Sequence, residues 1–123
     1  MTKTIEIAPH DLETIQQILH EHLPELTVWA FGSRVGGTAR KFSDLDIVIV
    51  SDKPLDTLRI ASLRDAFSDS DLSFKVDIIE WYGTDEEFRG IIKENYFALQ
   101  NTMGPATLSM MGSWFLSSNF YER

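Results

Sequence analysis

A chain of 123 residues with 43% hydrophobic and 24% charged residues has the composition of one globular domain with a single hydrophobic core. Its formal net charge of −8 argues against a large non-specific nucleic-acid surface, because such surfaces neutralise phosphates with Lys and Arg. The lack of cysteine excludes disulfides, thiolate catalysis and cysteine zinc sites.

The sequence shows neither a charged-then-apolar leader at its N-terminus nor a run of about 18 apolar residues. We therefore expect a cytoplasmic protein without a membrane segment. An acidic protein can still bind a nucleotide, provided that a metal ion lies between them.

The first elements expected are a helix and a strand. A helical pattern starts at Pro9, and Pro24 ends it. The apolar residues of this helix fall three or four positions apart on one face, at Leu12, Ile15, Leu19 and Leu23. The segment 26–31 is rich in residues that favour strands and predicts the first strand.

A Gly-Ser turn follows this strand. Gly32 permits close approach of the backbone, and the Ser33 hydroxyl can donate to a phosphate oxygen. Backbone N–H groups at the start of a short helix also form an anion site. The turn therefore predicts a phosphate contact, with Gly37 shaping the loop; the alternative is an ordinary turn.

Two carboxylates begin the second predicted strand, in the segment Ser43-Asp44-Leu45-Asp46. Side chains two positions apart on a strand share a face, so Asp44 and Asp46 can share one or two hard divalent cations. Without a cation they would repel each other. The alternative is a polar strand start in which Ser43 and Asp44 finish a turn.

A third carboxylate, Asp77, interrupts the apolar run of the strand expected at 74–81. A buried carboxylate needs a compensating partner, which a metal ion would supply and which Lys75 could supply instead. Glu80 is separated from Asp77 by an odd number of positions, so it should lie on the opposite face.

Two further helices flank this third strand. The first follows a turn at 51–54 and runs to about Phe67, and its predicted inward stripe is Leu55, Leu58, Ser62, Ala66 and Phe67. The second opens with a capping box from Thr84 to Glu87. Its predicted inward residues are Phe88, Ile91, Ile92, Tyr96 and Leu99. Beyond Gln100 the chain is apolar, and it could dock on this domain or on another chain.

The alternation of helices and strands favours an α/β sheet covered by helices. The run Gly32-Ser33, ten residues, Asp44-Leu45-Asp46, together with Gly37, resembles the minimal nucleotidyltransferases (MNT) of the DNA polymerase beta superfamily. The likeness covers roughly residues 10 to 100 and is greatest to the short MNT proteins that pair with helical HEPN proteins in prokaryotes. It implies a mixed α+β sheet, with a nucleotidyltransferase domain at 1–100 and an apolar tail at 101–123.

The resemblance implies that a hydroxyl attacks the α-phosphorus of a nucleoside triphosphate, with ATP as the expected donor. Asp44, Asp46 and Asp77 would be the catalytic residues and the ligands of Mg²⁺, with two ions expected. Asp77 could also accept the proton of the attacking hydroxyl. The expected nucleotide-binding residues are Gly32, Ser33, Arg34 and Gly37.

The resemblance also implies a partner. Related MNT antitoxins restrain a HEPN toxin by binding it and by attaching AMP to a tyrosine. The alternative is a catalytically weak nucleotide-binding module that neutralises its partner by complex formation alone. A nucleic-acid polymerase is disfavoured by the charge of −8 and the small size. Homo- and hetero-oligomers both remain open.

Overall fold

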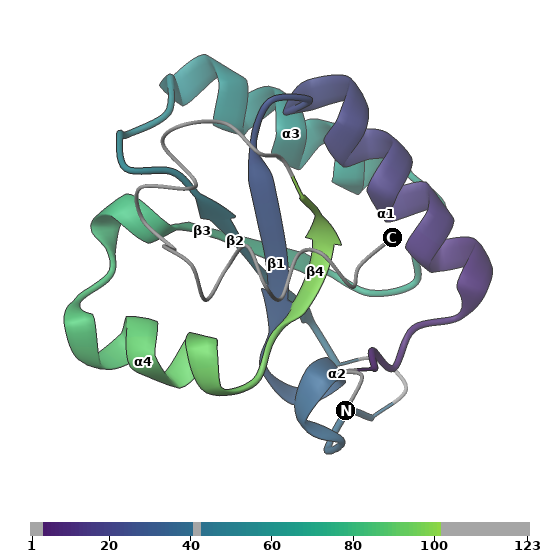
Figure 1. Cartoon of the computed structure of the whole chain (residues 1–123). Coiled ribbons are helices and arrows are strands. Elements are labelled where there is room, and N and C mark those ends of the chain that lie inside the picture. The colour runs from purple at the N-terminus through teal and green to yellow at the C-terminus, as the bar shows by residue number, and fades with distance from the viewer. Residues whose placement is uncertain (1–3, 41–42, 102–123) are drawn as a thin grey trace.

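The computed structural model describes residues 4–40 and 43–101. In these residues the elements are, in chain order, α1 (Pro9–His22), β1 (Thr27–Phe31), α2 (Ser33–Gly36), β2 (Leu45–Val50), α3 (Thr57–Asp69), β3 (Val76–Glu80), the short 3-10 helix η1 (Trp81–Gly83), α4 (Glu86–Glu94) and β4 (Phe97–Gln100). The strands form one mixed sheet in the order β3-β2-β1-β4 (Figure 1). No helix in this part of the chain is long and apolar enough to cross a membrane.

The pairing of the strands places β2 between β1 and β3. β1 runs antiparallel to β2, and β3 lies beside β2 in parallel. Because β2 is central, both the end of β1 and the start of β3 lie next to its acidic N-terminal residues. The topology therefore brings together the segments in which the sequence placed the site.

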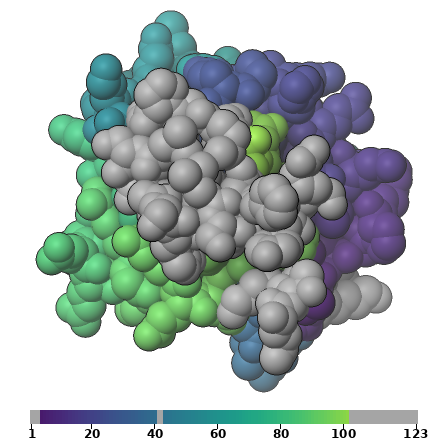
Figure 2. Space-filling view, viewed as in Figure 1, coloured from purple at the N-terminus to yellow at the C-terminus, as the bar shows by residue number. Residues whose placement is uncertain are grey.

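Two hydrophobic clusters hold helices on opposite faces of the sheet. On one face, α1 and α3 pack side by side against alternate residues of the strands (Figure 1). On the other face, Trp81 of η1 and Ile92 of α4 pack on Trp29 and Val48. The space-filling view places α1 and α4 on opposite sides of the molecule (Figure 2). This second face also receives Asp46 and Asp77, because each lies two positions from a residue of the second cluster.

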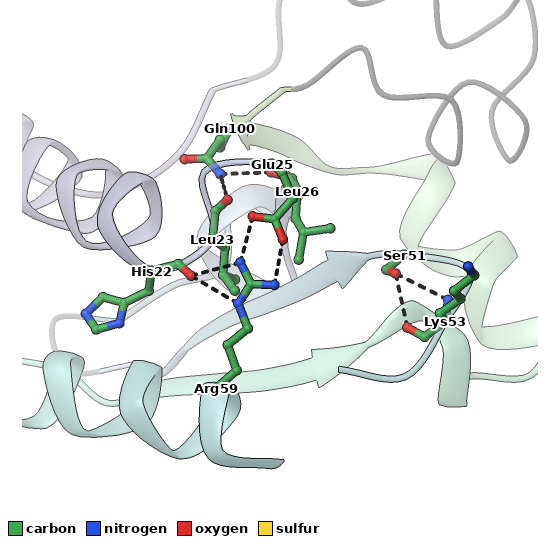
Figure 3. Close-up of polar contacts among 8 residues, drawn as sticks. All are labelled: His22, Leu23, Glu25, Leu26, Ser51, Lys53, Arg59 and Gln100. Carbon is green, nitrogen blue, oxygen red and sulfur yellow. Dashed lines mark hydrogen bonds and ion pairs between the residues drawn. The ribbon is translucent and has the colours of Figure 1, made fainter. Parts of the chain in front are cut away.

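The turn between α1 and β1 is tied to α3. Arg59 of α3 donates through Nη2 to Glu25 Oε1 at 2.6 Å and to the His22 carbonyl at 3.2 Å (Figure 3). The hydrogen bond from Arg59 lowers the pKa of the Glu25 carboxyl below its usual value. The guanidinium therefore satisfies a carbonyl at the end of α1 and fixes the entry to β1.

The same turn is tied to β4. Gln100 donates through Nε2 to the Leu23 carbonyl at 2.6 Å and to the Leu26 carbonyl at 2.8 Å (Figure 3). β4 is thereby joined to the start of β1 by side-chain as well as backbone hydrogen bonds.

β4 corrects one prediction, because the sequence suggested that the last helix continues past Tyr96. α4 instead ends at Glu94, and Phe97–Gln100 pairs with β1. Leu99 is buried as predicted, but on a strand. A short apolar run cannot be assigned to helix or strand from its periodicity alone.

The start of α4 corrects another prediction. Asp85 is the N-cap, and its carboxylate accepts from the Phe88 amide at 2.8 Å. Thr84 instead donates through its hydroxyl to the Trp81 carbonyl at 2.7 Å, within η1. The predicted Thr84 capping box is therefore wrong, because η1 places this hydroxyl against the preceding turn.

Two apolar side chains predicted to point inward are exposed: Leu58 at 76% and Ile91 at 54%. On α3, Phe67 is buried as predicted, but the other buried residues are Ile60 and Leu63, which the predicted stripe did not include. The serines and alanines of this helix leave its apolar face poorly defined in the sequence. Apart from Asn101, the predicted tail 101–123 lies outside the described residues.

Candidate active site

Gly32 forms a sharp turn between β1 and α2. It lies at the N-cap of α2 with φ +83° and ψ −157°, a conformation that L side chains rarely adopt. Its carbonyl accepts from the amides of Val35 and Gly36 at 3.0 and 2.9 Å. A Cβ at this position would also collide with the Asp46 carboxylate. Both observations require glycine, and they place the turn directly against β2.

Asp46 and Asp77 are neighbours across the sheet. In the strand register, Asp46 lies opposite Phe31 on one side and opposite Asp77 on the other. Asp44 lies one residue before β2 begins and is exposed. Partial burial, together with the charges of Asp77 and Asp44, raises the pKa of the Asp46 carboxyl above its usual value. The three carboxylates thus form a locally repulsive group, which a cation would stabilise.

Asp77 has a nearby basic partner, because Lys75 Nζ lies 3.8 Å from Asp77 Oδ1. Both side chains are largely exposed, at 73% for Lys75 and 48% for Asp77, so the ion pair is weak. Within residues 4–40 and 43–101, no three or more His, Cys, Asp or Glu side chains are gathered closely enough to hold a metal ion. The register brings the carboxylates to one place, but their side chains are not drawn into a closed ligand set.

Other residues singled out in the sequence occupy different places. Gly37 has φ +84° and closes the C-terminal end of α2, as expected for a residue that shapes the loop. Glu80 lies on the α1 and α3 face, where Oε1 accepts from the Leu55 amide at 2.9 Å. Trp29 and Trp81 are buried in the core, 5.6 Å apart between ring centroids. Neither tryptophan is a platform for a nucleotide base.

Arg34, one of the expected nucleotide-binding residues, is buried. Its side chain is 6% exposed. Nε donates to the Ser43 carbonyl at 2.9 Å, and Nη1 donates to the Glu6 carbonyl at 2.7 Å. The guanidinium carbon lies 4.1 Å from the centre of the Phe74 ring. Sequence reasoning missed these partners. Two are backbone carbonyls, which leave no signal in side-chain identity, and the third is an aromatic ring far away in the sequence.

Comparison with known proteins agrees with this geometry. The family model described as polymerase beta nucleotidyltransferase matches residues 13–97, which include the glycine turn and all three carboxylates. The chain belongs to this family. The nucleotidyltransferase is also 47% identical, over 96 residues, to the probable protein adenylyltransferase MntA of Haemophilus influenzae. That match covers 78% of this chain and 84% of the relative.

Solved structures with the same fold include toxin–antitoxin complexes. One, described as a toxin–antitoxin with AMP-PNP, superimposes with a TM-score of 0.65 at 21% identity and covers 89% of each chain. Another is a tri-AMPylated Shewanella oneidensis HEPN toxin in complex with an MNT antitoxin. It gives a TM-score of 0.61 at 17% identity, covering 93% of the nucleotidyltransferase and 89% of that chain. At these identities the likeness establishes the fold.

Proposed function

We propose that this nucleotidyltransferase transfers AMP from ATP to a hydroxyl of a HEPN-type partner protein, and so acts as the antitoxin of a toxin–antitoxin pair. The observation that carries the proposal is the pairing of Asp46 with Asp77 across β2 and β3, directly beside the glycine turn. The relative named as a probable protein adenylyltransferase supports the reaction. The AMP-PNP complex and the AMPylated HEPN toxin support the nucleotide and the partner.

Asp44, Asp46 and Asp77 are the residues that would hold Mg²⁺, with room expected for two ions. The donor set fits, because carboxylate oxygens are the ligands that Mg²⁺ prefers, and partial burial together with their mutual repulsion raises the pKa of Asp46. When bound, Mg²⁺ would neutralise charge on the triphosphate and on the leaving pyrophosphate. Asp44 is exposed and Asp77 is half-buried, so a cation could reach both carboxylates from solvent.

The protein groups around the carboxylates would bind and orient the nucleotide. Gly32 lacks a side chain and so seats the Asp46 carboxylate against the turn, and the hydroxyl of the next residue, Ser33, would donate to a phosphate oxygen. Asp77 is partly exposed, so an acceptor can reach it. It would take the proton of the attacking hydroxyl, provided that the hydroxyl lies within hydrogen-bond reach.

The acceptor would come from the partner. The four strands and their helices account for residues up to Gln100 and leave no second substrate domain among the described residues. ATP as the substrate, together with a chain without cysteine, supports a cytoplasmic location.

The experiment combines the protein with a HEPN-type helical partner and supplies α-labelled ATP with Mg²⁺. We expect label on the partner and a mass increase of one AMP. Asp44→Asn and Asp46→Asn should each lower the transfer rate at least about 100-fold, because each removes a charged oxygen ligand at the reacting phosphate. Asp52→Asn is the matched control, because this exposed carboxylate follows the opposite end of β2.

Two results would contradict the proposal. Transfer that survives Asp46→Asn would refute the role of the carboxylates. Stable binding of the partner without any transfer by the wild-type protein would favour the alternative, a module that neutralises its partner by complex formation alone.

A further inference from the structure

Arg34 is the buried charged residue in the part of the chain that the structure describes, and it directly follows Ser33. Burial of a guanidinium is costly unless its N–H groups are bonded. Here Nε donates to the Ser43 carbonyl and Nη1 to the Glu6 carbonyl, at 2.9 and 2.7 Å. These bonds lie in the plane of the guanidinium and hold two of its N–H groups on backbone carbonyls inside the protein.

The partners of Arg34 connect the segments that make up the site. Ser43 immediately precedes Asp44, so the bond from Nε closes the loop between the glycine turn and the acidic pair. The Glu6 amide also donates to the Arg34 carbonyl at 2.7 Å, which makes the contact with the N-terminal segment reciprocal. One side chain therefore fixes both ends of the loop and the segment that precedes α1.

The third contact reaches the strand that carries Asp77. The guanidinium stacks on Phe74, 4.1 Å from its ring centre. Two residues further, Val76 opens β3, and the Leu45 amide donates to the Lys75 carbonyl at 2.8 Å. Arg34 thus packs where the starts of β2 and β3 are joined.

We infer that Arg34 is a positioning residue, which holds the glycine turn and Asp44 at the separation needed for nucleotidyl transfer, and is not a phosphate ligand. The inference rests on the proposed function for its effect on rate, but its effect on the loop does not need turnover. Arginine is required here, because its planar, forked guanidinium donates to two carbonyls and stacks on an aromatic ring at the same time. Lysine has the same charge without that fork.

The test compares Arg34→Lys with Arg40→Met. Arg40 is exposed in the same loop, so its replacement removes a nearby charge without removing these bonds. We expect Arg34→Lys to lower kcat for AMP transfer about 10- to 100-fold, because small displacements of reacting groups are costly, while KM for ATP changes less than about threefold. Arg40→Met should retain kcat. A phosphate ligand would behave differently, with Arg34→Lys preserving most activity or raising KM in proportion to the loss.

A second readout is independent of catalysis. Hydrogen exchange at the amides of Gly36 and Leu45 should accelerate at least about tenfold in Arg34→Lys and remain unchanged in Arg40→Met, whether or not the wild-type protein transfers AMP. If exchange at both amides is unchanged, the inference is overturned. If exchange accelerates but wild-type protein transfers nothing, the proposed function fails while the role of Arg34 in the loop stands.

If Arg34→Lys does not fold, the same measurements on Phe74→Leu test the inference. This variant removes the stacking surface without changing a charge or a hydrogen-bonding group. The same acceleration of exchange at Leu45 and a several-fold lower kcat are expected. Unchanged exchange and unchanged kcat in this variant would overturn the inference.

Discussion

At the scale of single residues, the site is governed by close approach and by charge. Gly32 leaves space that the Asp46 carboxylate occupies, and Asp77 lies opposite Asp46 on the next strand. This arrangement destabilises the ionised form of Asp46, whose pKa is raised by partial burial and by the neighbouring charges. Residues that favour nucleotide binding here therefore oppose the stability of the metal-free protein.

Asp46→Asn should stabilise the metal-free protein at neutral pH. The raised pKa means that protonated Asp46 favours the folded state, an advantage lost as the pH rises through that pKa, so the ionised group costs stability at pH 7. Because the carboxylate remains partly solvated, we expect a gain of roughly 0.5 kcal/mol in the free energy of unfolding. Urea denaturation with EDTA measures it, with Asp52→Asn as control. The gain should vanish below the ordinary pKa of aspartate; a loss of stability at pH 7 would contradict the assignment.

Gly32→Ala should impair both stability and transfer. Alanine at φ +83° is strained, and its Cβ displaces the Asp46 carboxylate. We expect a loss of roughly 1–3 kcal/mol in the free energy of unfolding, with a lower transfer rate. Thermal and urea denaturation measure the first effect. Gly83→Ala is the control, because no atom lies within 4 Å of the Cβ that it adds; equal losses in the two variants would refute a specific need for Gly32.

At the scale of elements, the sequence predicts where helices and strands begin and end, except where tertiary packing overrides the local signal. α1 begins at Pro9 as the sequence predicts and ends at His22, two residues before Pro24. β2 follows the acidic pair as predicted, and β3 occupies Val76–Glu80 within the strand expected at 74–81. The start of α4 differs, because η1 engages Thr84 and leaves Asp85 to cap the helix. β4 forms because the free edge of β1 offers a hydrogen-bonding partner that the sequence of residues 97–100 does not reveal.

Asp85→Ala should destabilise the protein by about 1 kcal/mol, because the Phe88 amide loses its capping acceptor. Chemical denaturation measures the change. Glu87→Ala is the informative control: as an exposed residue in the first turn it should cost less than about 0.5 kcal/mol. A larger effect at Glu87 than at Asp85 would restore the capping box predicted from the sequence.

At the scale of the whole molecule, the layer formed by α1 and α3 is joined to the sheet through the turn between α1 and β1. Arg59 reaches this turn from α3 and Gln100 reaches it from β4, so distant parts of the chain satisfy the same group of carbonyls (Figure 3). The opposite end of β1 carries the glycine turn. The contacts of Arg59 and Gln100 anchor the sheet at one end, so the other end can hold carboxylates that repel each other.

Glu25→Gln should reduce stability modestly and in a pH-dependent way. The bond from Arg59 lowers the pKa of Glu25, so its contribution is present above the ordinary value of 4.5 and is lost as the pH falls through the lowered value. The pair is 36% and 54% exposed, so the expected loss at pH 7 is only roughly 0.5 kcal/mol. Denaturation across pH measures it, beside the exposed α1 variant Glu13→Gln. A loss that persists unchanged at pH 2 would exclude this ion pair as the cause.

The sequence by itself determined the family, the Gly32 turn and the identity of three carboxylates, because these depend on residue type and on spacing along the chain. The strand register then decided that Asp46 and Asp77 are direct neighbours. Only the tertiary structure assigned Arg34, since its partners are carbonyls and an aromatic ring contributed by three separate segments. Its charge suggested a phosphate, but burial directs that charge into the scaffold of the site.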